Sequence, residues 1–520
     1  MKPLLLALAM SIPAAAQTCI VAGVVTDVAH NGPLQRAHVT LLGARAFKAA
    51  ISTGADGRFL FEVAPGRYNL YAEHNEWRVQ FGNPEPTAGF GSAIIASPDQ
   101  DTAHLAFRWY APGAVFGKVV DEQSEPVRDA TVQLIRDGIV GGRKRVLPAG
   151  TTTTDDRGEY RFGTVASGTY YVAASGRPWQ ATQVFANSFP GASSQVSAAY
   201  PPTYYPGVTD GRDAATLTVR PGAEIRADVP LRATTSATVK IRCPGSGVPD
   251  EACAGLPTLA LHGLGGVELS TQPDYNFQTH SFVGVAPGRY TVHAAGAGKT
   301  AYKVIDVGSG EFTFDLALES SAVITGAVAY KNPLPARARE YIGIDNEIAG
   351  GRGYGVLLAP DGTFTFHVSG APFRPRLYGT VPMFIAELWM DGTEIKDGLV
   401  DVTENASVHL KIVAGDEIGN VKGFAISGDR PVPAVLVVLA PAAGSRNPTD
   451  YRGFQTESDG SFDYVSVKAG DYLLFAIDKL DLEYTNRDAL RPYLQLATPV
   501  HIAPHAVVEQ RISVTAAKQN

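Results

Sequence analysis

One short pattern recurs along the chain and constrains its fold more than any other feature. An acidic turn is followed by two aromatic residues separated by one position, and then by glycine, any residue and tyrosine. Copies lie at residues 55–73, 155–172, 274–292 and 459–474, and a partial copy without the Gly-x-Tyr half lies at 360–366. The copies are roughly a hundred residues apart, the length of one β-sandwich domain. This spacing predicts a series of similar domains.

The first copy shows why the pattern predicts strands and turns. Asp56-Gly57 is a tight turn, because glycine adopts positive φ at no steric cost and aspartate bonds its own backbone. Phe59 and Phe61 alternate with polar or small residues, the period of a strand with one face buried. Pro65-Gly66 forms a second turn, and Tyr68 then begins another strand as a core or corner ring.

The acidic residues of these turns raise the question of calcium. Asp56, Asp156, Asp361 and Asp459 recur at this position, and only Asp155-Asp156 is an adjacent acidic pair. A Ca²⁺ site needs six to eight oxygen ligands packed closely together. We therefore expect turn chemistry at these positions.

Matching strands precede and follow each copy. A Gly-containing strand opens most units, a turn and a buried strand follow, and a further strand closes each unit. Since no helical periodicity is sustained, we predict an all-β protein, a tandem array of about five antiparallel β-sandwich domains. The expected units are 20–111, 112–233, 234–318, 319–413 and 414–516. The third diverges most, and its opening strand lacks the glycine.

The order of these motifs resembles the carboxypeptidase regulatory-like domain. Unit two matches best, through Gly117 to Asp121, Pro126 to Leu134, Thr154 to Phe162 and Gly168 to Ala173. Units one and five match well, and units three and four in part. The resemblance implies a prealbumin-like β-sandwich, close in shape to Cna B-type and starch-binding-like domains. It also implies tandem, non-catalytic modules of exported bacterial proteins. These motifs mark the fold and carry no chemistry.

The N-terminus predicts export. Lys2, the apolar run Leu4 to Ile12 and the small residues Ala14 to Ala16 are typical of a signal peptide, which we place at residues 1–16. Residues 16–18 (Ala-Gln-Thr) do not fit the pattern that precedes a lipid-modified cysteine. No later run reaches the length of a membrane span. We therefore expect an extracellular, periplasmic or outer-envelope location.

The chain has three cysteines, which in an exported protein imply one pair and one odd thiol. Cys243 and Cys253 are close in sequence, and we expect a disulfide between them. Cys19, near a terminus expected to fray, is left over.

We find no motif that predicts catalysis, a metal or a cofactor. Gly-x-Ser-x-Gly, His-Glu-x-x-His and phosphate-binding loop patterns are missing, and the eleven histidines are scattered without metal-ligand spacing. The net charge of −7 argues against nucleic acid as a partner. We therefore expect no enzyme.

An aromatic insertion in unit two, residues 177–213, is the most distinctive segment. Trp179, Tyr200, Tyr204 and Tyr205 are its candidate ligand-binding residues, because aromatic planes beside polar groups suit sugar rings. Alternatively, the insertion folds back and fills its own sandwich with these rings. The first interpretation predicts a binding or adhesion module, with a polysaccharide or an envelope protein as partner. The second favours a structural spacer or assembly partner, and short linkers such as 231–237 would give a semi-rigid string of domains.

Overall fold

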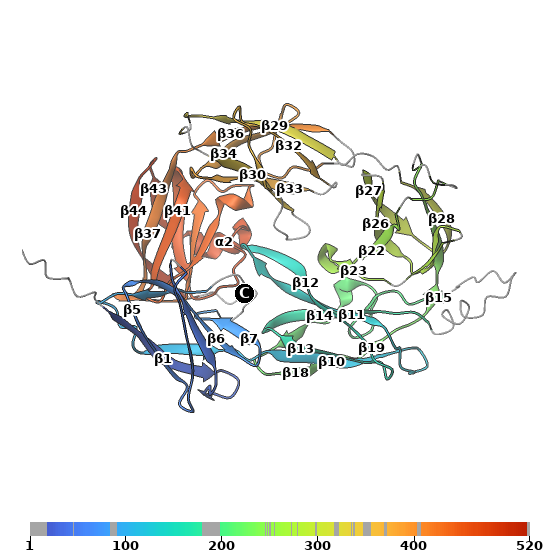
Figure 1. Ribbon diagram of the computed structural model, residues 1–520, viewed down its shortest axis with the longest axis horizontal. Coiled ribbons are helices and arrows are strands. Elements are labelled where there is room, and N and C mark those ends of the chain that lie inside the picture. The colour runs from blue at the N-terminus through green and yellow to red at the C-terminus, as the bar shows by residue number, and fades with distance from the viewer. Residues whose placement is uncertain are drawn as a thin grey trace, which may run out of the picture.

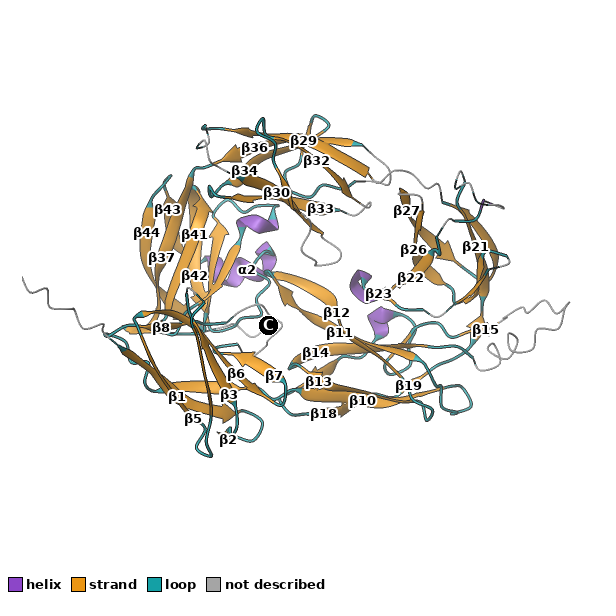
Figure 2. Ribbon diagram, in the orientation of Figure 1, coloured by secondary structure: helices purple, strands orange, loops and turns teal. Residues whose placement is uncertain are grey.

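The computed structural model describes residues 18–516, apart from 45, 84–90, 179–197, 245, 247, 249–250, 254, 272, 278, 297–298, 317–321, 334, 336–338, 347–354, 369–371 and 403–406. Almost all regular elements of the described chain are strands, joined by loops and turns (Figure 2). These strands form five successive groups of packed sheets, which we number as units one to five. The prediction of an all-β tandem array is confirmed.

The first two units span the N-terminal part of the chain. Unit one contains β1 (Cys19–Asp27), β2 (Gly32–Pro33), β3 (His38–Leu42), β4 (Lys48–Ser52), β5 (Arg58–Val63), β6 (Gly66–His74), β7 (Trp77–Gln80), β8 (Ile94–Ala96) and β9 (Leu105–Trp109). Unit two contains β10 (Gly113–Val120), β11 (Thr131–Val140), β12 (Arg143–Thr153), β13 (Glu159–Val165), β14 (Gly168–Ser175), β15 (Ala198–Ala199), β16 (Thr203–Tyr204), the 3₁₀ turn η1 (Gly211–Asp213), β17 (Leu217–Val219), β18 (Glu224–Arg226) and β19 (Val229–Pro230).

Units three to five follow in the same way. Unit three contains β20 (Thr234–Thr235), β21 (Ala237–Arg242), β22 (Thr258–His262), η3 (Leu264–Gly266), β23 (Glu268–Leu269), β24 (Asp274–Asn276), β25 (Ser281–Val285), β26 (Gly288–Gly296), β27 (Lys299–Val307) and β28 (Gly310–Asp315). Unit four contains β29 (Ala322–Tyr330), β30 (Glu340–Asn346), β31 (Gly355–Leu357), β32 (Thr363–Val368), β33 (Phe373–Gly379), β34 (Phe384–Met390), β35 (Thr393–Glu394) and β36 (Val408–Gly415). Unit five contains β37 (Ile418–Ser427), β38 (Arg430–Pro431), β39 (Leu436–Pro441), η4 (Pro448–Asp450), β40 (Arg452–Gln455), β41 (Ser461–Lys468), β42 (Gly470–Ile477), α2 (Arg487–Leu494), β43 (Thr498–Ile502) and β44 (Val507–Thr515).

One sheet of every unit is organised around the opening strand. In unit one, β1 pairs antiparallel with β5 and parallel with the closing strand β9. Units two to five repeat this arrangement around β10, β21, β29 and β37. The sheets are therefore mostly antiparallel, with a parallel pair in each unit that the sequence pattern does not predict.

A close backbone contact explains why the opening strand contains a glycine. A Cβ built on Gly117 would lie 2.2 Å from the carbonyl oxygen of Ala227, which precedes the neighbouring strand β19. Gly23, Gly326 and Gly423 are equally close to carbonyl oxygens of their own parallel neighbours. Only glycine allows the two backbones to approach this closely.

The hydroxyl group of the repeated tyrosine makes the same hydrogen bond in the four units that contain it. Tyr68 donates a hydrogen bond of 2.8 Å to the carbonyl oxygen of Ala64, four residues earlier. The same bond joins Tyr170 to Ala166, Tyr290 to Ala286 and Tyr472 to Lys468. The ring of each tyrosine is buried in its unit, so it is both a corner and a core residue.

The acidic turn residues bond their own turns. Asp56, Asp361 and Asp459 each accept a hydrogen bond from the backbone N–H two residues later. In unit two this role belongs to Asp155, which accepts from Arg157 and Glu159 at 2.9 and 2.8 Å. Asp155 lies three residues before the turn glycine Gly158, whereas Asp56 and Asp459 directly precede theirs, so the acidic residue that bonds the turn of unit two is Asp155 and not the expected Asp156.

Unit five contains an α-helix that the sequence analysis did not predict. α2 begins after Asn486, whose side chain accepts a hydrogen bond of 3.0 Å from the N–H of Asp488. Its buried residues Leu490 and Tyr493 pack on the sheet that contains β39 and β42, on the face turned away from the core of the sandwich. There the Tyr493 ring stacks on Phe475. With eight residues, α2 is too short to show a sustained helical period in the sequence.

The five units follow one another around a closed arrangement (Figure 1). Unit five lies beside unit one, and the long hairpin of β11 and β12 reaches across toward α2. The expectation of a semi-rigid string is therefore wrong for this structure. Short linkers are compatible with a string and with a ring, and contacts between residues distant in sequence decide between them.

Candidate functional site

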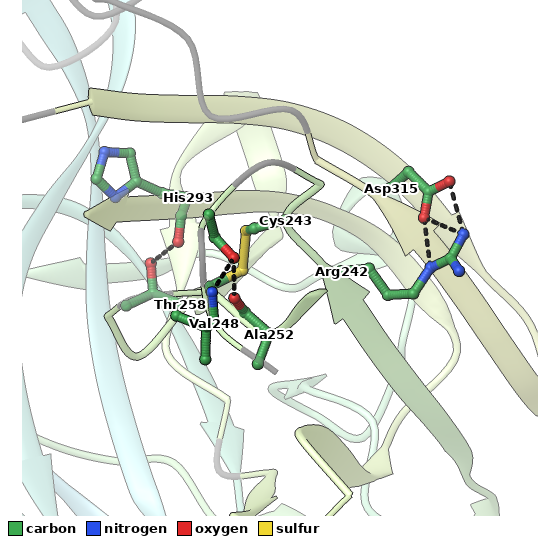
Figure 3. Close-up of a disulfide and its surroundings, with 9 residues drawn as sticks. Arg242, Cys243, Val248, Ala252, Thr258, His293 and Asp315 are labelled. Carbon is green, nitrogen blue, oxygen red and sulfur yellow. Dashed lines mark hydrogen bonds and ion pairs between the residues drawn. A yellow bond between two sulfur atoms is a disulfide. The ribbon is translucent and has the colours of Figure 1, made fainter. Parts of the chain in front are cut away.

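The cysteine pair of unit three begins directly after β21, next to Arg242 (Figure 3). Cys243 and Cys253 form a disulfide with their Cα atoms 4.9 Å apart. Inside the loop that it closes, the Ser246 hydroxyl donates to the carbonyl oxygen of Ala252 at 2.7 Å. Next to the bridge, Arg242 donates two hydrogen bonds to Asp315, of 2.7 and 2.8 Å, which join the opening and closing strands. The disulfide therefore closes a loop at strands that are already paired with each other.

The third cysteine is part of a core. Cys19 begins β1, and only 5% of it is exposed, among the apolar residues of unit one. The expectation of a frayed terminus at Cys19 is wrong, because β1 pairs with β5 from its first residue. A buried thiol of this kind acts as a small apolar side chain.

The described tyrosines of the insertion lie in cores. Tyr200 is 5% exposed and packs in unit two, and the half-buried Tyr205 lies against the same cluster. Tyr204 is 2% exposed and belongs to the core of unit three, where its hydroxyl accepts a hydrogen bond of 2.8 Å from the N–H of Leu264. Burial raises the pKa of Tyr200 to about 12 and also raises the pKa of Tyr204. Trp179 lies outside the described residues.

Tyr200 packs in the core of its own unit, as the second interpretation expects, whereas Tyr204 packs with unit three, which neither interpretation foresaw. Tyr200 and Tyr204 contribute packing surface and offer no exposed aromatic plane. The sequence did not indicate that Tyr204 joins two units, because its partner Leu264 is 60 residues further along the chain.

Units one and five meet in an interface that we call the clasp, formed by Arg67, Gly82, residues 92–95 and residues 455–458. Ser458 makes two of the bonds in the clasp: its N–H donates to the carbonyl oxygen of Ala93 at 2.9 Å, and its side-chain hydroxyl accepts from the N–H of Ile95 at 2.9 Å. The Ser92 hydroxyl donates to the carbonyl oxygen of Thr456 at 2.7 Å. Gln455 adds bonds from its side-chain amide to Gly82 and Ser92.

Glu457 is the charged centre of the clasp. It is 5% exposed, and one of its carboxylate oxygens accepts from Arg67 at 3.0 and 2.6 Å. The other oxygen accepts from the N–H of Ala93. A buried carboxylate is tolerated only when such charge-assisted bonds replace its hydration. Because both partners come from unit one, Glu457 depends on the closed arrangement.

A second contact crosses the arrangement. The hairpin of β11 and β12 turns at Gly141 and Gly142, both with positive φ. The carbonyl oxygen of Gly142 accepts from the N–H and the hydroxyl of Thr485 in unit five, at 3.1 and 2.8 Å. A Cβ on Gly142 would meet the ring of Tyr484, so the tip of the hairpin lies directly on unit five.

The hairpin also forms one wall of a cleft of about 1080 Å³ between units two, four and five. Unit two contributes β12, unit four contributes β33 and β34, and unit five contributes residues 447–454 and the end of β41. Arginines extend from two of these units, with Arg143 and Arg145 on β12 and Arg374 and Arg376 on β33. The cleft is the candidate functional site, since ligand sites favour the boundaries of domains.

Unit five completes the lining of the cleft. Arg452 donates to the carbonyl oxygens of Val465 and Ser466, at 2.9 Å each. Burial, with a smaller contribution from the nearby charge of Arg376, lowers the pKa of Arg452 below its ordinary value. The Lys468 ammonium lies 5.2 Å from the centre of the Phe384 ring of unit four. The sequence analysis missed this cleft because its lining residues come from three units that are distant in the sequence.

The described part of the chain holds no group of three or more His, Cys, Asp or Glu side chains arranged to bind a metal ion. Within the same residues, no helix has the length and apolar character needed to cross a membrane.

Comparison with known proteins finds similarity to solved structures. No family model and no curated protein matches the chain. Solved structures with similar segments include the TIE protein of Bacillus anthracis, at 8% identity and a TM-score of 0.16 over 95% of this chain and 68% of that one. They also include the shaft pilin SpaA of Lactobacillus rhamnosus GG, at 12% identity and a TM-score of 0.20 over 42% of this chain and 98% of that one. The RrgB pilus protein of Streptococcus pneumoniae matches at 8% identity and a TM-score of 0.15, over 71% and 90% of the two chains.

Scores of this size do not establish a shared overall fold. The resemblance to carboxypeptidase regulatory-like domains therefore remains an inference from sequence motifs.

Proposed function

We propose that this chain is an exported, non-catalytic scaffold protein of the cell envelope, in which five β-sandwiches are held in one closed arrangement. The observation that carries the proposal is the clasp. Domains that move independently would gain nothing from burying Glu457 against Arg67, 390 residues away. The clasp therefore supports a rigid assembly partner over a flexible spacer.

The export part of the proposal rests on residues 1–16. Their short positive start, apolar run and small residues are typical of a cleaved leader. The disulfide of unit three agrees with an oxidising compartment.

Cell fractionation and limited proteolysis test the two parts together. The full chain should be found outside the cytoplasm, whereas a variant without residues 1–16 should stay inside. The purified mature chain should resist cleavage between units, because a closed arrangement shields the linkers. A chain that remains cytoplasmic, or that is rapidly cut into separate sandwiches, would contradict the scaffold role.

Adhesion through carbohydrate binding is the second candidate function. It rests on Trp179 and on the half-buried Tyr205, since the burial of Tyr200 and Tyr204 does not support an aromatic platform. A pull-down against soluble and insoluble polysaccharides, with Trp179→Ala and Tyr205→Ala variants, tests it. Binding that either variant loses, at an unchanged melting temperature, would support adhesion, and an empty panel would exclude these polysaccharides as ligands.

A further inference from the structure

The clasp differs from the joint between units two and three in the kind of contact that it makes. Units two and three share one apolar core, in which Ile135 and Tyr204 of unit two pack with residues of unit three. In the described part of the chain, the apolar clusters of units one and five each contain residues of their own unit alone. The clasp therefore rests mainly on polar bonds, which water can replace when the two units separate.

The two halves of the clasp lie on the first and the last unit of the chain. Arg67 and residues 92–95 belong to unit one, whereas residues 455–458 belong to unit five (Figure 1). The two surfaces differ from each other and are complementary, so the interface is heterologous. A heterologous interface between the two ends of one chain can equally join the end of one copy to the beginning of another.

The clasp is specific for its two surfaces. Glu457 accepts hydrogen bonds from the guanidinium group of Arg67 and from the N–H of Ala93, so it requires a cation and a backbone donor side by side. A Cβ on Gly82 would lie 2.7 Å from the Ser92 hydroxyl and 3.1 Å from the side-chain amide of Gln455. A charge pair and a close fit of this kind select one partner surface over others. Every copy of the chain carries both surfaces, so a second copy has the chemistry that the clasp recognises.

An exchange of units between two copies preserves other joints of the arrangement. Units two and three stay joined by the bond from the Leu264 N–H to Tyr204, and units four and five by the contact of Lys468 with the Phe384 ring. The exchange replaces the clasp, and the contacts of the β11–β12 hairpin with units four and five, by the same contacts with the second copy. Within one chain the two halves meet at an effective concentration on the order of millimolar, so the single closed chain predominates in dilute solution.

We propose that the clasp is also an assembly interface, in which residues 455–458 of one copy of the chain bind the unit-one surface around Arg67 of a second copy. Two copies that exchange units four and five form a reciprocal dimer with two clasps. This inference rests on the proposed scaffold role, because it takes the closed arrangement as the resting state. It identifies a second copy of the chain as a partner of the scaffold.

Charge reversal tests the proposal, because it makes exchange between chains the way to pair the charges. Arg67→Glu brings two carboxylates together in the clasp of one chain, and Glu457→Arg brings two guanidinium groups together. In a reciprocal dimer of these two variants, one clasp pairs the two reversed charges and the other keeps the native pair. We expect each variant alone to have the mass of one chain, and a concentrated equimolar mixture to contain a species of twice that mass. Light scattering on the eluate of a sizing column measures both.

Two control proteins accompany the mixture. The double variant Arg67→Glu/Glu457→Arg restores an opposite pair within one chain, so it should keep the mass of one chain and a melting temperature close to the native value. This result would show that the chain tolerates both side chains. Arg289→Glu, at an exposed position of unit three, is the matched control, and its mixture with Glu457→Arg should stay at the mass of one chain.

A cysteine trap gives a second test that leaves the charges of the clasp unchanged. Ile95→Cys on one chain and Ser458→Cys on another place thiols at positions where the N–H of residue 95 lies 2.9 Å from the side-chain oxygen of residue 458. Slow oxidation of the concentrated mixture should give a covalent dimer on a non-reducing gel. Either variant oxidised alone should give much less of it.

Two results would overturn the proposal, and small-angle scattering distinguishes them. In the first, the charge-reversed mixture stays at the mass of one chain and the trap gives no dimer, while each single variant has a larger radius of gyration than the compact double variant. The clasp would then close within one chain alone, and the scaffold role would stand. In the second, Arg67→Glu and Glu457→Arg are each as compact as the native chain. The clasp would then hold nothing together in solution, and the scaffold role would fail with the exchange.

Discussion

The guanidinium group of Arg67 in unit one donates two hydrogen bonds, of 3.0 and 2.6 Å, to a single carboxylate oxygen of Glu457 in unit five. Glu457 directly follows Thr456, in the position that Asp155 takes after Thr154 in unit two. Asp155 bonds the N–H groups of its own turn, whereas the longer Glu457 reaches the neighbouring unit. Glutamate is longer than aspartate by one methylene group. At this position of the turn, the aspartate of unit two bonds its own turn, whereas the glutamate of unit five bonds the neighbouring unit.

The first prediction concerns this carboxylate. Glu457→Gln should destabilise the clasp by roughly 1–2 kcal/mol, because a neutral amide replaces a buried charge-assisted acceptor and Arg67 is half-exposed. Hydrogen exchange at the amides of Ala93 and Ser458 should become faster. Glu62→Gln, at an exposed position of β5, is the control. Unchanged exchange in Glu457→Gln would mean that the clasp does not depend on the charge.

The second prediction concerns the opening-strand glycine of unit two. Gly117→Ala should destabilise this unit by about 3 kcal/mol, because the added Cβ would lie 2.2 Å from the carbonyl oxygen of Ala227. Gly163→Ala is the matched control, since its Cβ would meet nothing within 4 Å. Chemical denaturation followed by fluorescence compares the two variants. Similar effects of both would refute the close approach of β10 to residue 227.

The third prediction concerns the disulfide. Cys243→Ser together with Cys253→Ser should lower the free energy of unfolding of unit three by about 2–3 kcal/mol, the loop-closure entropy of so short a loop. Calorimetry should show the melting of unit three shifting down. Reduction of the native chain should give the same shift. A double variant that melts like the native chain would show that the paired sheet alone fixes the loop.

The fourth prediction concerns alkaline pH. Burial raises the pKa of Tyr200, Tyr472 and Tyr484 to about 12 each. In the unfolded chain tyrosine loses its proton near pH 10, about two pH units earlier. Between these values the unfolded state binds fewer protons than the folded state, so the free energy of unfolding falls as pH rises.

Melting temperatures measured between pH 9 and pH 12 should therefore decrease. Absorbance at the phenolate band should show a group of tyrosines that ionise late. In Tyr484→Phe the decrease should be smaller, because one of the ionisable rings is gone. A stability that stays constant across this window would contradict the burial of these three rings.

Local features of the fold follow from the sequence, because they depend on neighbouring residues. The positive φ of Gly57 and the alternating burial of Phe59 and Phe61 are set by residues within one turn or strand. The parallel pairing of β1 with β9 is not local, since about eighty residues separate the two strands. α2 was missed because eight residues, one of them Pro492, give no clear helical period.

The candidate site was less predictable than the fold. The insertion tyrosines were notable as a sequence cluster, yet Tyr200 and Tyr204 lie in the cores of two different units. The cleft and the clasp arise where units distant in sequence meet. Arg143, Arg376 and Arg452 belong to three different units and show no common pattern in the sequence.

Small-angle X-ray scattering of the mature chain tests the closed arrangement most directly. The native chain should scatter as one compact particle whose curve matches the structure. The double variant Glu457→Ala/Gln455→Ala should show a larger radius of gyration and a longer maximum dimension, because the clasp is lost. A native curve that instead fits five sandwiches in an extended string, and that the double variant leaves unchanged, would contradict the account.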